Sequence, residues 1–268
     1  MPPVIRIDDP DDPRLADYRE VRERDLVGRR GSFVAEGLVV LEKLIRAGRH
    51  PLRSVLVAEK RIEALQPLFA ELAAGVAVYA ASQAVMDAVV GFPIHRGVLA
   101  VGTRAEADLE TVLAGLPARA LVVGLVGIAN HDNMGGLFRN AAAFGADAVL
   151  LDTGCCDPLY RKAIRVSVGA ALSVPFARAG EAADLVGALQ DRAFSVVALS
   201  PSGEADLVGF RPAARTAVLF GTEGPGLPAV VMARARTVRI EMAGGFDSLN
   251  VATSSGIVLH HMVASRVK

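Results

Sequence analysis

The fold is decided by residues 119–152, whose sequence is RALVVGLVGIANHDNMGGLFRNAAAFGADAVLLD. The first ten residues are apolar at nearly every position, so a strand formed there would be buried on both faces. Such a strand is typical of the centre of a parallel sheet. A helix at 133–145 and a second strand at 146–152 follow it. The stretch therefore predicts an α/β fold.

Downstream, the chain continues to alternate strands and helices. Short runs rich in Val and Ala predict further strands at 174–179, 194–200, 216–221 and 237–242. Helical periodicity predicts helices at 157–172, 181–193, 227–235 and 248–266. We expect one α/β domain over residues 119–268.

Upstream, a smaller α/β domain is predicted over residues 1–103, joined to the first by a linker at 104–118 that is charged and then rich in turn residues. Its strands are expected at 33–37, 54–59, 76–80 and 96–103, and its helices at 38–48, 61–75 and 82–91. Ser82 is a natural N-cap and Gly48 a natural helix end. A leading helix is predicted for 11–28, with Asp12 as its cap and Pro13 in its first turn.

Composition limits the class of protein. The chain has 29 basic and 29 acidic residues, and this balance neither favours nor excludes a nucleic-acid partner, since local patches decide. No apolar run reaches the roughly 18 residues of a membrane span. The first fifteen residues carry four aspartates and no apolar core, unlike a secretory signal. We expect a soluble, cytoplasmic protein.

Several familiar chemistries find no support in the sequence. Cys155 and Cys156 are adjacent and cannot link distant elements, and no Cys or His spacing indicates a metal site, so we expect neither a disulfide nor a metal. His260 and His261 are expected to be solvated or capping residues. A dinucleotide-binding unit would need G-x-G-x-x-G between strand and helix, whereas the glycines here fall at 124, 127, 135 and 136. A nicotinamide-dependent oxidoreductase is therefore disfavoured.

Three polar or glycine-rich segments remain as candidates. The first contains Asn133 and Arg139, and an arginine buried in this apolar helix would need an anionic partner, if only a structural ion pair. The second is LFGTEGPGL (219–227), where glycines permit close approach to a ligand or simply a tight turn. The third is RIEMAGGFDSLNVATSSGIVL (239–259), where Ser248 could be no more than an N-cap.

Together these three segments resemble the three motifs of the SpoU/TrmH-type RNA methyltransferases of the SPOUT superfamily. The resemblance covers about residues 119–268, and residues 1–103 look like the family's RNA substrate-binding domain. It implies a trefoil-knotted sheet, in which the last helix threads a loop, and a homodimer with a shared active site. Glu241, Asn140 and Thr222 depart from the residues that are common in the family.

The resemblance also implies site residues. S-adenosylmethionine would be bound bent, mostly through backbone groups, at Leu199, Ser200, Gly221, Ile240, Met242 and Leu249. The family's functional positions fall on Asn133, Arg139, Glu223, Ser248 and Asn250.

The implied reaction is S-adenosylmethionine-dependent methylation of an RNA ribose 2′-hydroxyl, with rRNA favoured over tRNA. In the family Arg139 would be the base. Guanidinium groups are practically never deprotonated in proteins, so we interpret it as a phosphate clamp that stabilises the developing alkoxide. Glu223 would orient it, while Asn133, Ser248 and Asn250 position the ribose and the cosubstrate. A catalytically silent RNA-binding protein and a base methyltransferase remain alternatives.

RNA delivery is expected from the N-terminal domain. Its arginines cluster at Arg22, Arg24, Arg29 and Arg30, and again at Arg46, Arg49 and Arg53. Acidic residues are interleaved with both clusters, so an ordinary solvated surface is an equally good interpretation.

Overall fold

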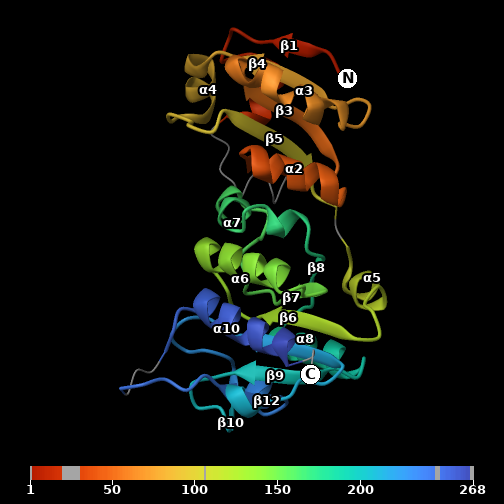
Figure 1. Cartoon of the computed structure of the whole chain (residues 1–268), viewed down its shortest axis with the longest axis vertical. Coiled ribbons are helices and arrows are strands. Elements are labelled where there is room, and N and C mark those ends of the chain that lie inside the picture. The colour runs from red at the N-terminus through yellow and green to blue at the C-terminus, as the bar shows by residue number, and fades with distance from the viewer. Residues whose placement is uncertain (1, 20–30, 106, 245–247, 266–268) are drawn as a thin grey trace. The chain divides into compact units, whose positions relative to one another are not determined.

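The computed structural model describes residues 2–19, 31–105, 107–244 and 248–265. The chain divides into two compact units, the first comprising Met1–Ala105 with Leu159–Ser173 and the second Glu106–Pro158 with Val174–Lys268. Each unit is built on its own sheet (Figure 1). Among the described residues, no helix combines the length and apolar character that crossing a membrane requires.

The first unit is built on a five-stranded sheet in the order β1-β4-β3-β5-β2. Strand β5 runs antiparallel to its neighbours β3 and β2, and the other pairs are parallel. The strands are β1 Val4–Arg6, β2 Ser32–Glu36, β3 Leu52–Ala58, β4 Ala77–Ala81 and β5 Val98–Thr103. Four of them confirm the prediction. Strand β1 was not predicted, because its three residues are too few to show a pattern.

The helices of this sheet follow the predicted positions. They are α2 Leu38–Ala47, α3 Ile62–Ala70 and α4 Gln83–Val90, with short 3-10 helices η1 Pro13–Tyr18 and η2 Glu59–Arg61. Ser82 caps α4 as predicted, its hydroxyl accepting a hydrogen bond from the Val85 N–H at 3.2 Å. Gly48 ends α2 in the left-handed conformation. Capping residues therefore place the end of α2 and the start of α4, whereas α3 has no side-chain cap and ends five residues earlier than predicted.

The leading helix is shorter than predicted. Asp12 caps it as expected, accepting a hydrogen bond from the Arg14 N–H at 2.9 Å, with Pro13 in the first turn. It is a 3-10 helix that ends at Tyr18, because Arg19 is extended. The predicted remainder, and the arginine cluster at Arg22–Arg30, lie in 20–30, outside the described residues.

The second unit is built on a seven-stranded parallel sheet in the order β10-β12-β9-β11-β6-β7-β8. Every residue of β6, Ala120–Leu125, is buried, as predicted for a central strand. The other strands are β7 Ala148–Leu151, β8 Phe176–Arg178, β9 Ser195–Leu199, β10 Ala205–Asp206, β11 Arg215–Phe220 and β12 Arg236–Arg239. Strand β10 was not predicted, and β12 ends three residues earlier than expected.

The helices of this unit are α5 Leu109–Ala114, α6 His131–Ala143, α8 Ala182–Gln190, α9 Ala229–Met232 and α10 Val251–Ala264, with the 3-10 helix η4 Leu207–Gly209. Helix α10 lies alongside α6 (Figure 1). Helix α6 begins two residues before the predicted start, with Asn130 as its N-cap.

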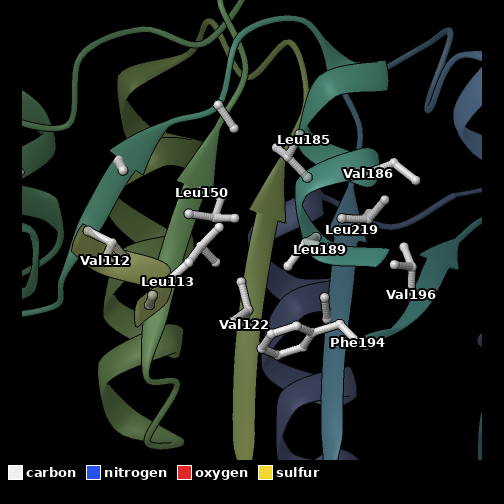
Figure 2. Packing of buried hydrophobic residues seen from close by; sticks show 14 of the residues in the cluster. Val112, Leu113, Val122, Leu150, Leu185, Val186, Leu189, Phe194, Val196 and Leu219 are labelled. Atoms are coloured by element: carbon white, nitrogen blue, oxygen red, sulfur yellow. The ribbon is translucent and has the colours of Figure 1, made fainter. Parts of the chain in front are cut away.

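The core of the second unit includes residues that we predicted to lie in a linker. Figure 2 shows Val112 and Leu113 of α5 in the same apolar layer as Leu150 and Val122. Helix α8 contributes Leu185, Val186 and Leu189 to this layer. Most of the stretch 104–118 thus belongs to the second unit, because its apolar residues are buried there.

The predicted helix at 157–172 is broken in two. It forms α7 Arg161–Val166 and η3 Ala170–Leu172, separated by Val168 and Gly169 with φ of 52° and 78°. A β-branched residue rarely adopts a left-handed conformation, so no sequence pattern predicted this break. The segment belongs to the first unit, where Arg161 forms an ion pair with the buried Glu36 at 3.1 Å.

Ala193, exposed at the end of α8, occupies a position that favours glycine. Its φ is 56°, the Phe194 N–H bonds to the Leu189 carbonyl, and its own N–H bonds to the Gln190 carbonyl. This is the hydrogen-bond pattern of a helix end whose left-handed residue is usually glycine.

Replacing Ala193 by glycine should stabilise the protein by about 1 kcal/mol, because the left-handed backbone is strained for any residue with a Cβ. Ala188→Gly, inside α8, is the matched control and should destabilise by about 1 kcal/mol. Urea unfolding measures both. Destabilisation by Ala193→Gly would contradict the assigned conformation.

Candidate active site at the carboxyl edge of the parallel sheet

A pocket of about 300 Å³ opens where strands β9, β11 and β12 end. These strands are parallel neighbours, so their carboxyl ends meet at one edge of the sheet. Segments that are far apart in sequence therefore meet there. The lining residues are Leu199, Ser200, Pro201, Phe220, Gly221, Thr222, Glu223, Gly224, Gly226, Ile240, Met242, Ser248, Leu249, Asn250, Val251 and Ser254.

All six residues that the sequence analysis assigned to the cosubstrate line this one pocket. Leu199 and Ser200 follow β9, Gly221 follows β11, and Ile240 and Met242 follow β12. Leu249 precedes α10. Their binding role stays a prediction, but the structure brings them together.

Glycine is required in the loop after β11. A Cβ at Gly221 would lie 2.5 Å from the backbone carbon of Gly226, closer than such atoms ever approach. Gly226 and Gly224 have φ of 70° and 86°, and the Gly226 N–H bonds to the Thr222 carbonyl. The loop therefore folds back on itself so tightly that Gly221 has no room for a side chain.

Three predicted functional side chains, one from each segment, hydrogen-bond to one another. Asn133 Nδ2 donates to Glu223 Oε1 at 3.0 Å. Asn250 Nδ2 donates to the same oxygen at 2.9 Å and to Asn133 Oδ1 at 2.9 Å. Asn133 is only 8% exposed. This closed network fixes the β11 loop against the starts of α6 and α10.

Asn250, and not Ser248, is the N-cap of α10. Its Oδ1 accepts hydrogen bonds from the N–H groups of Ala252 at 2.9 Å and Thr253 at 3.3 Å. The alternative that Ser248 is no more than an N-cap is therefore wrong, because the helix starts two residues later. Ser248 is exposed and lines the pocket.

Helices α6 and α10 pack closely enough to hold this network. A Cβ at Gly136 would lie 2.6 Å from the Cβ of Ala252. Asn140 Nδ2 donates to the Ala252 carbonyl at 2.6 Å and to Ser255 Oγ at 2.8 Å. From the sequence, Asn140 was noted only as a departure from the family. Its hydrogen bonds to α10 were not predicted, because α10 lies more than a hundred residues further along the chain.

Arg139 does not lie where its sequence context suggested. It was expected inside the apolar helix, but it is exposed and is not among the pocket's lining residues. Six residues separate it from Asn133, which places it about 120° around the helix. Within the described part of the chain, the Arg139 side chain makes no ion pair or hydrogen bond. The structural ion pair considered for it is therefore not seen.

Pro201 and Ser254 also line the pocket and were not predicted as site residues. Ser254 is 8% exposed and lies one helical turn after Asn250. That spacing places both on the same side of the helix and could have identified Ser254.

The two cysteines near this edge of the sheet, Cys155 and Cys156, are poorly suited to react as thiolates. Cys155 lies under the loop after β6, where its Sγ accepts from the Ile128 N–H at 3.4 Å and donates to the Leu125 carbonyl at 3.3 Å. Burial raises the pKa of this thiol to about 12, and burial raises that of Cys156 to about 11. In the part of the chain that is described, no three His, Cys, Asp or Glu side chains are grouped to hold a metal.

The family model of the SpoU rRNA methylases matches residues 120–260, which include the whole network and pocket. The chain belongs to the SpoU rRNA methylase family. It is an RNA methyltransferase of the SpoU/TrmH type, with the mixed α/β fold of that family.

Two relatives illustrate the similarity of this SpoU family member. An uncharacterised tRNA/rRNA methyltransferase of Mycobacterium bovis is 40% identical, with 96% of this chain and 91% of that protein covered. The 23S rRNA (guanosine-2′-O-)-methyltransferase RlmB of Photobacterium profundum is 30% identical, with 79% of this chain and 88% of that protein covered.

A solved structure shows the same fold along nearly the whole chain. The rRNA methyltransferase of Sinorhizobium meliloti, crystallised with S-adenosylmethionine bound, superposes with a TM-score of 0.83 at 23% identity. The comparison covers 96% of this SpoU family chain and 97% of that one.

Changing Asn250 to aspartate tests the network separately from the cap. Aspartate keeps the capping oxygen but loses both donors and places a carboxylate against Glu223. We expect a loss of about 1–2 kcal/mol in urea unfolding at pH 8. The loss should shrink toward pH 5, because one of two adjacent carboxylates takes up a proton more readily and the folded state then binds more protons than the unfolded state.

Asn130→Asp is the matched control. Asn130 caps α6 by accepting from the Asp132 and Asn133 N–H groups, and its amide nitrogen donates to none of the described residues. This variant should change stability by less than about 0.5 kcal/mol at either pH. Equal effects of the two variants would contradict the network.

Proposed function

We propose that this chain transfers the methyl group of S-adenosylmethionine to a ribose 2′-hydroxyl of RNA, with rRNA as the substrate. The observation that carries the proposal is the hydrogen-bonded network of Asn133, Glu223 and Asn250 beside a pocket whose lining includes the glycine loop after β11. The relative RlmB, a 23S rRNA (guanosine-2′-O-)-methyltransferase, supports both the ribose and the rRNA.

The pocket fits the methyl donor. Its volume of about 300 Å³ is within the range of small-molecule sites. Glu223 is the one charged residue among the described residues that line it, so the pocket favours a cation. A sulfonium donor satisfies this preference, whereas the pyrophosphate of a dinucleotide would meet no basic side chain. The charge of the lining therefore also argues against the nicotinamide alternative.

The donor supplies an activated methyl group on a sulfonium that leaves as a neutral thioether. The chain's own residues therefore need mainly to orient the hydroxyl, whose proton would pass to an RNA phosphate oxygen or to water. Ser248 is exposed at the rim, where its hydroxyl can hold the ribose. Asn133 and Asn250, held by Glu223, keep the glycine loops in place. Arg139 would bind the neighbouring phosphate and stabilise the charge that develops on the 2′-oxygen.

Because Arg139 does not line the pocket of its own chain, we propose that it serves the pocket of a second copy in a homodimer. Apolar side chains on the second unit support such a contact. Ile257 of α10 is 41% exposed and Val208 of η4 is 79% exposed. Helix α10 and η4 lie together, since His261 Nε2 bonds to the Phe210 carbonyl at 2.9 Å. We also propose the family's trefoil knot for the second unit and a cytoplasmic location.

The function is tested with rRNA from cells that lack the gene and with methyl-labelled donor. A 2′-O-methyl group blocks alkaline cleavage of the next phosphodiester bond, so we expect the label in alkali-resistant dinucleotides. Gly221→Ala should abolish the label and weaken donor binding by calorimetry more than tenfold, because the loop cannot keep its path. Gly187→Ala is the control, since it lies inside α8, does not line the pocket, and a Cβ there meets only Arg234 Nη2 at 3.6 Å, an ordinary contact.

Label in mononucleotides would contradict ribose methylation in favour of a base. A wild-type protein that binds RNA but neither binds the donor nor transfers label would establish the silent alternative.

The shared site is tested by complementation. Arg139→Ala and Gly221→Ala chains carrying different tags are co-expressed, and mixed dimers are purified through both tags. If Arg139 acts in the partner's site, each mixed dimer has one complete site and about half the wild-type activity. If Arg139 acts in its own chain, the mixed dimers are as inactive as either parent.

A further inference from the structure

Three neighbouring strands of the first unit bring arginines to one edge of its sheet. Arg61 follows the end of β3, and Arg96 precedes the start of β5. Because β5 is antiparallel to β3 and β2, its start lies at the edge where those strands end. Arg161 reaches the same edge through its ion pair with Glu36, the last residue of β2.

Arg96 lies across the backbone at the end of β2. A Cβ at Gly37, whose φ is 100°, would be 3.0 Å from both Cδ and Nη1 of Arg96. Gly37 therefore leaves space for the arginine to extend over the chain. Arg96 is exposed, and it forms no hydrogen bond or ion pair with any residue that the structure describes.

Arg61 lies one strand further along. Its Nε is 3.4 Å from the position of a Cβ at Gly97, directly next to Arg96 in the chain. This Nε is buried and has no hydrogen-bond partner among the described residues. Among the described residues, no carboxylate pairs with Arg61, so its positive charge is available to an anionic ligand.

An aromatic ring completes the edge. The Arg161 guanidinium lies over the Phe92 ring, 4.9 Å from its centroid, while its nitrogen donates to Glu36 at 3.1 Å. Phe92 is nonetheless 41% exposed. An exposed ring that needs no burial for folding is available to stack on a flat apolar partner.

We infer that Arg61, Arg96, Arg161 and Phe92, the arginine edge, bind an unpaired segment of the RNA substrate. Arginine forks suit phosphate oxygens, and unstacked bases stack on aromatic rings and guanidinium planes. Of the acids nearby, Glu36 is paired with Arg161, and Glu59 with Arg6 at 3.6 Å. A third, Asp87, accepts hydrogen bonds from the Ile94 N–H and from Gln83, both at 2.9 Å. The inference rests on the proposed function only in taking RNA as the substrate.

The arginine edge differs from the surface that the sequence suggested. Arg46 and Arg49 lie at the other end of α2, about 15 Å from Gly37 along the helix. Arg53 is engaged by Asp17 at 3.0 Å. Among the described residues, the arginines of this second cluster are therefore less well placed to meet phosphates beside an exposed ring.

The test measures fluorescence anisotropy of a labelled, unstructured 20-nucleotide RNA with the full-length protein. Arg61→Ala/Arg96→Ala should weaken binding about tenfold and reduce the dependence of log affinity on log salt by about 1.4, the value for two phosphate contacts on a single strand. Phe92→Leu should weaken binding to this RNA several-fold but leave binding to a duplex of the same sequence unchanged.

Arg46→Ala/Arg49→Ala is the charge-matched control and should keep wild-type affinity. Equal losses in the two double variants, or no loss in Arg61→Ala/Arg96→Ala, would overturn the arginine edge. Donor binding by calorimetry, which these surface changes should not affect, reports on the proposed function separately. If Arg61→Ala/Arg96→Ala keeps wild-type RNA affinity while the protein still binds the donor, the arginine edge is refuted and the proposed function is not.

Discussion

The site depends on one carboxylate oxygen, Glu223 Oε1, which accepts hydrogen bonds from the amides of both Asn133 and Asn250. The third hydrogen bond, from Asn250 to Asn133, closes the network. Each side chain comes from a different segment, and the segments are separated by up to 117 residues. A hydrogen bond to a charged group is stronger than one between neutral groups, so this small cluster can hold three loops in one arrangement.

The parallel sheet and its glycines give the network its context. Parallel strands place their carboxyl ends together, and each strand here delivers a loop to the pocket. Gly221 and Gly226 let the β11 loop approach itself at backbone distance. The result is a pocket with walls of main chain and apolar side chains and with a single acidic charge, which suits a small cationic donor better than an anionic one.

Local sequence rules predicted what local chemistry controls. The fully apolar strand at β6, the caps Asp12 and Ser82 and the end at Gly48 all follow from interactions within a few residues. The motifs also named residues that the structure brings together at one pocket, because parallel strands end at the same edge of the sheet. The predictions failed where distant contacts decide. Helix α5 forms because Val112 and Leu113 have a core to enter, and the helix predicted at 157–172 is interrupted at a strained Val168, after α7 has ended at Val166. Whether Arg139 is exposed depends on which face of α6 packs against α10, and the sequence of α6 alone does not show this.

The most direct measurement is a crystal structure of the full-length protein with S-adenosylmethionine. The account predicts the donor between Gly221, Met242 and Leu249, with the Asn133–Glu223–Asn250 hydrogen bonds intact and Arg139 of a second copy reaching the same cavity. A donor bound elsewhere, or a cavity that stays empty at saturating donor, would contradict it.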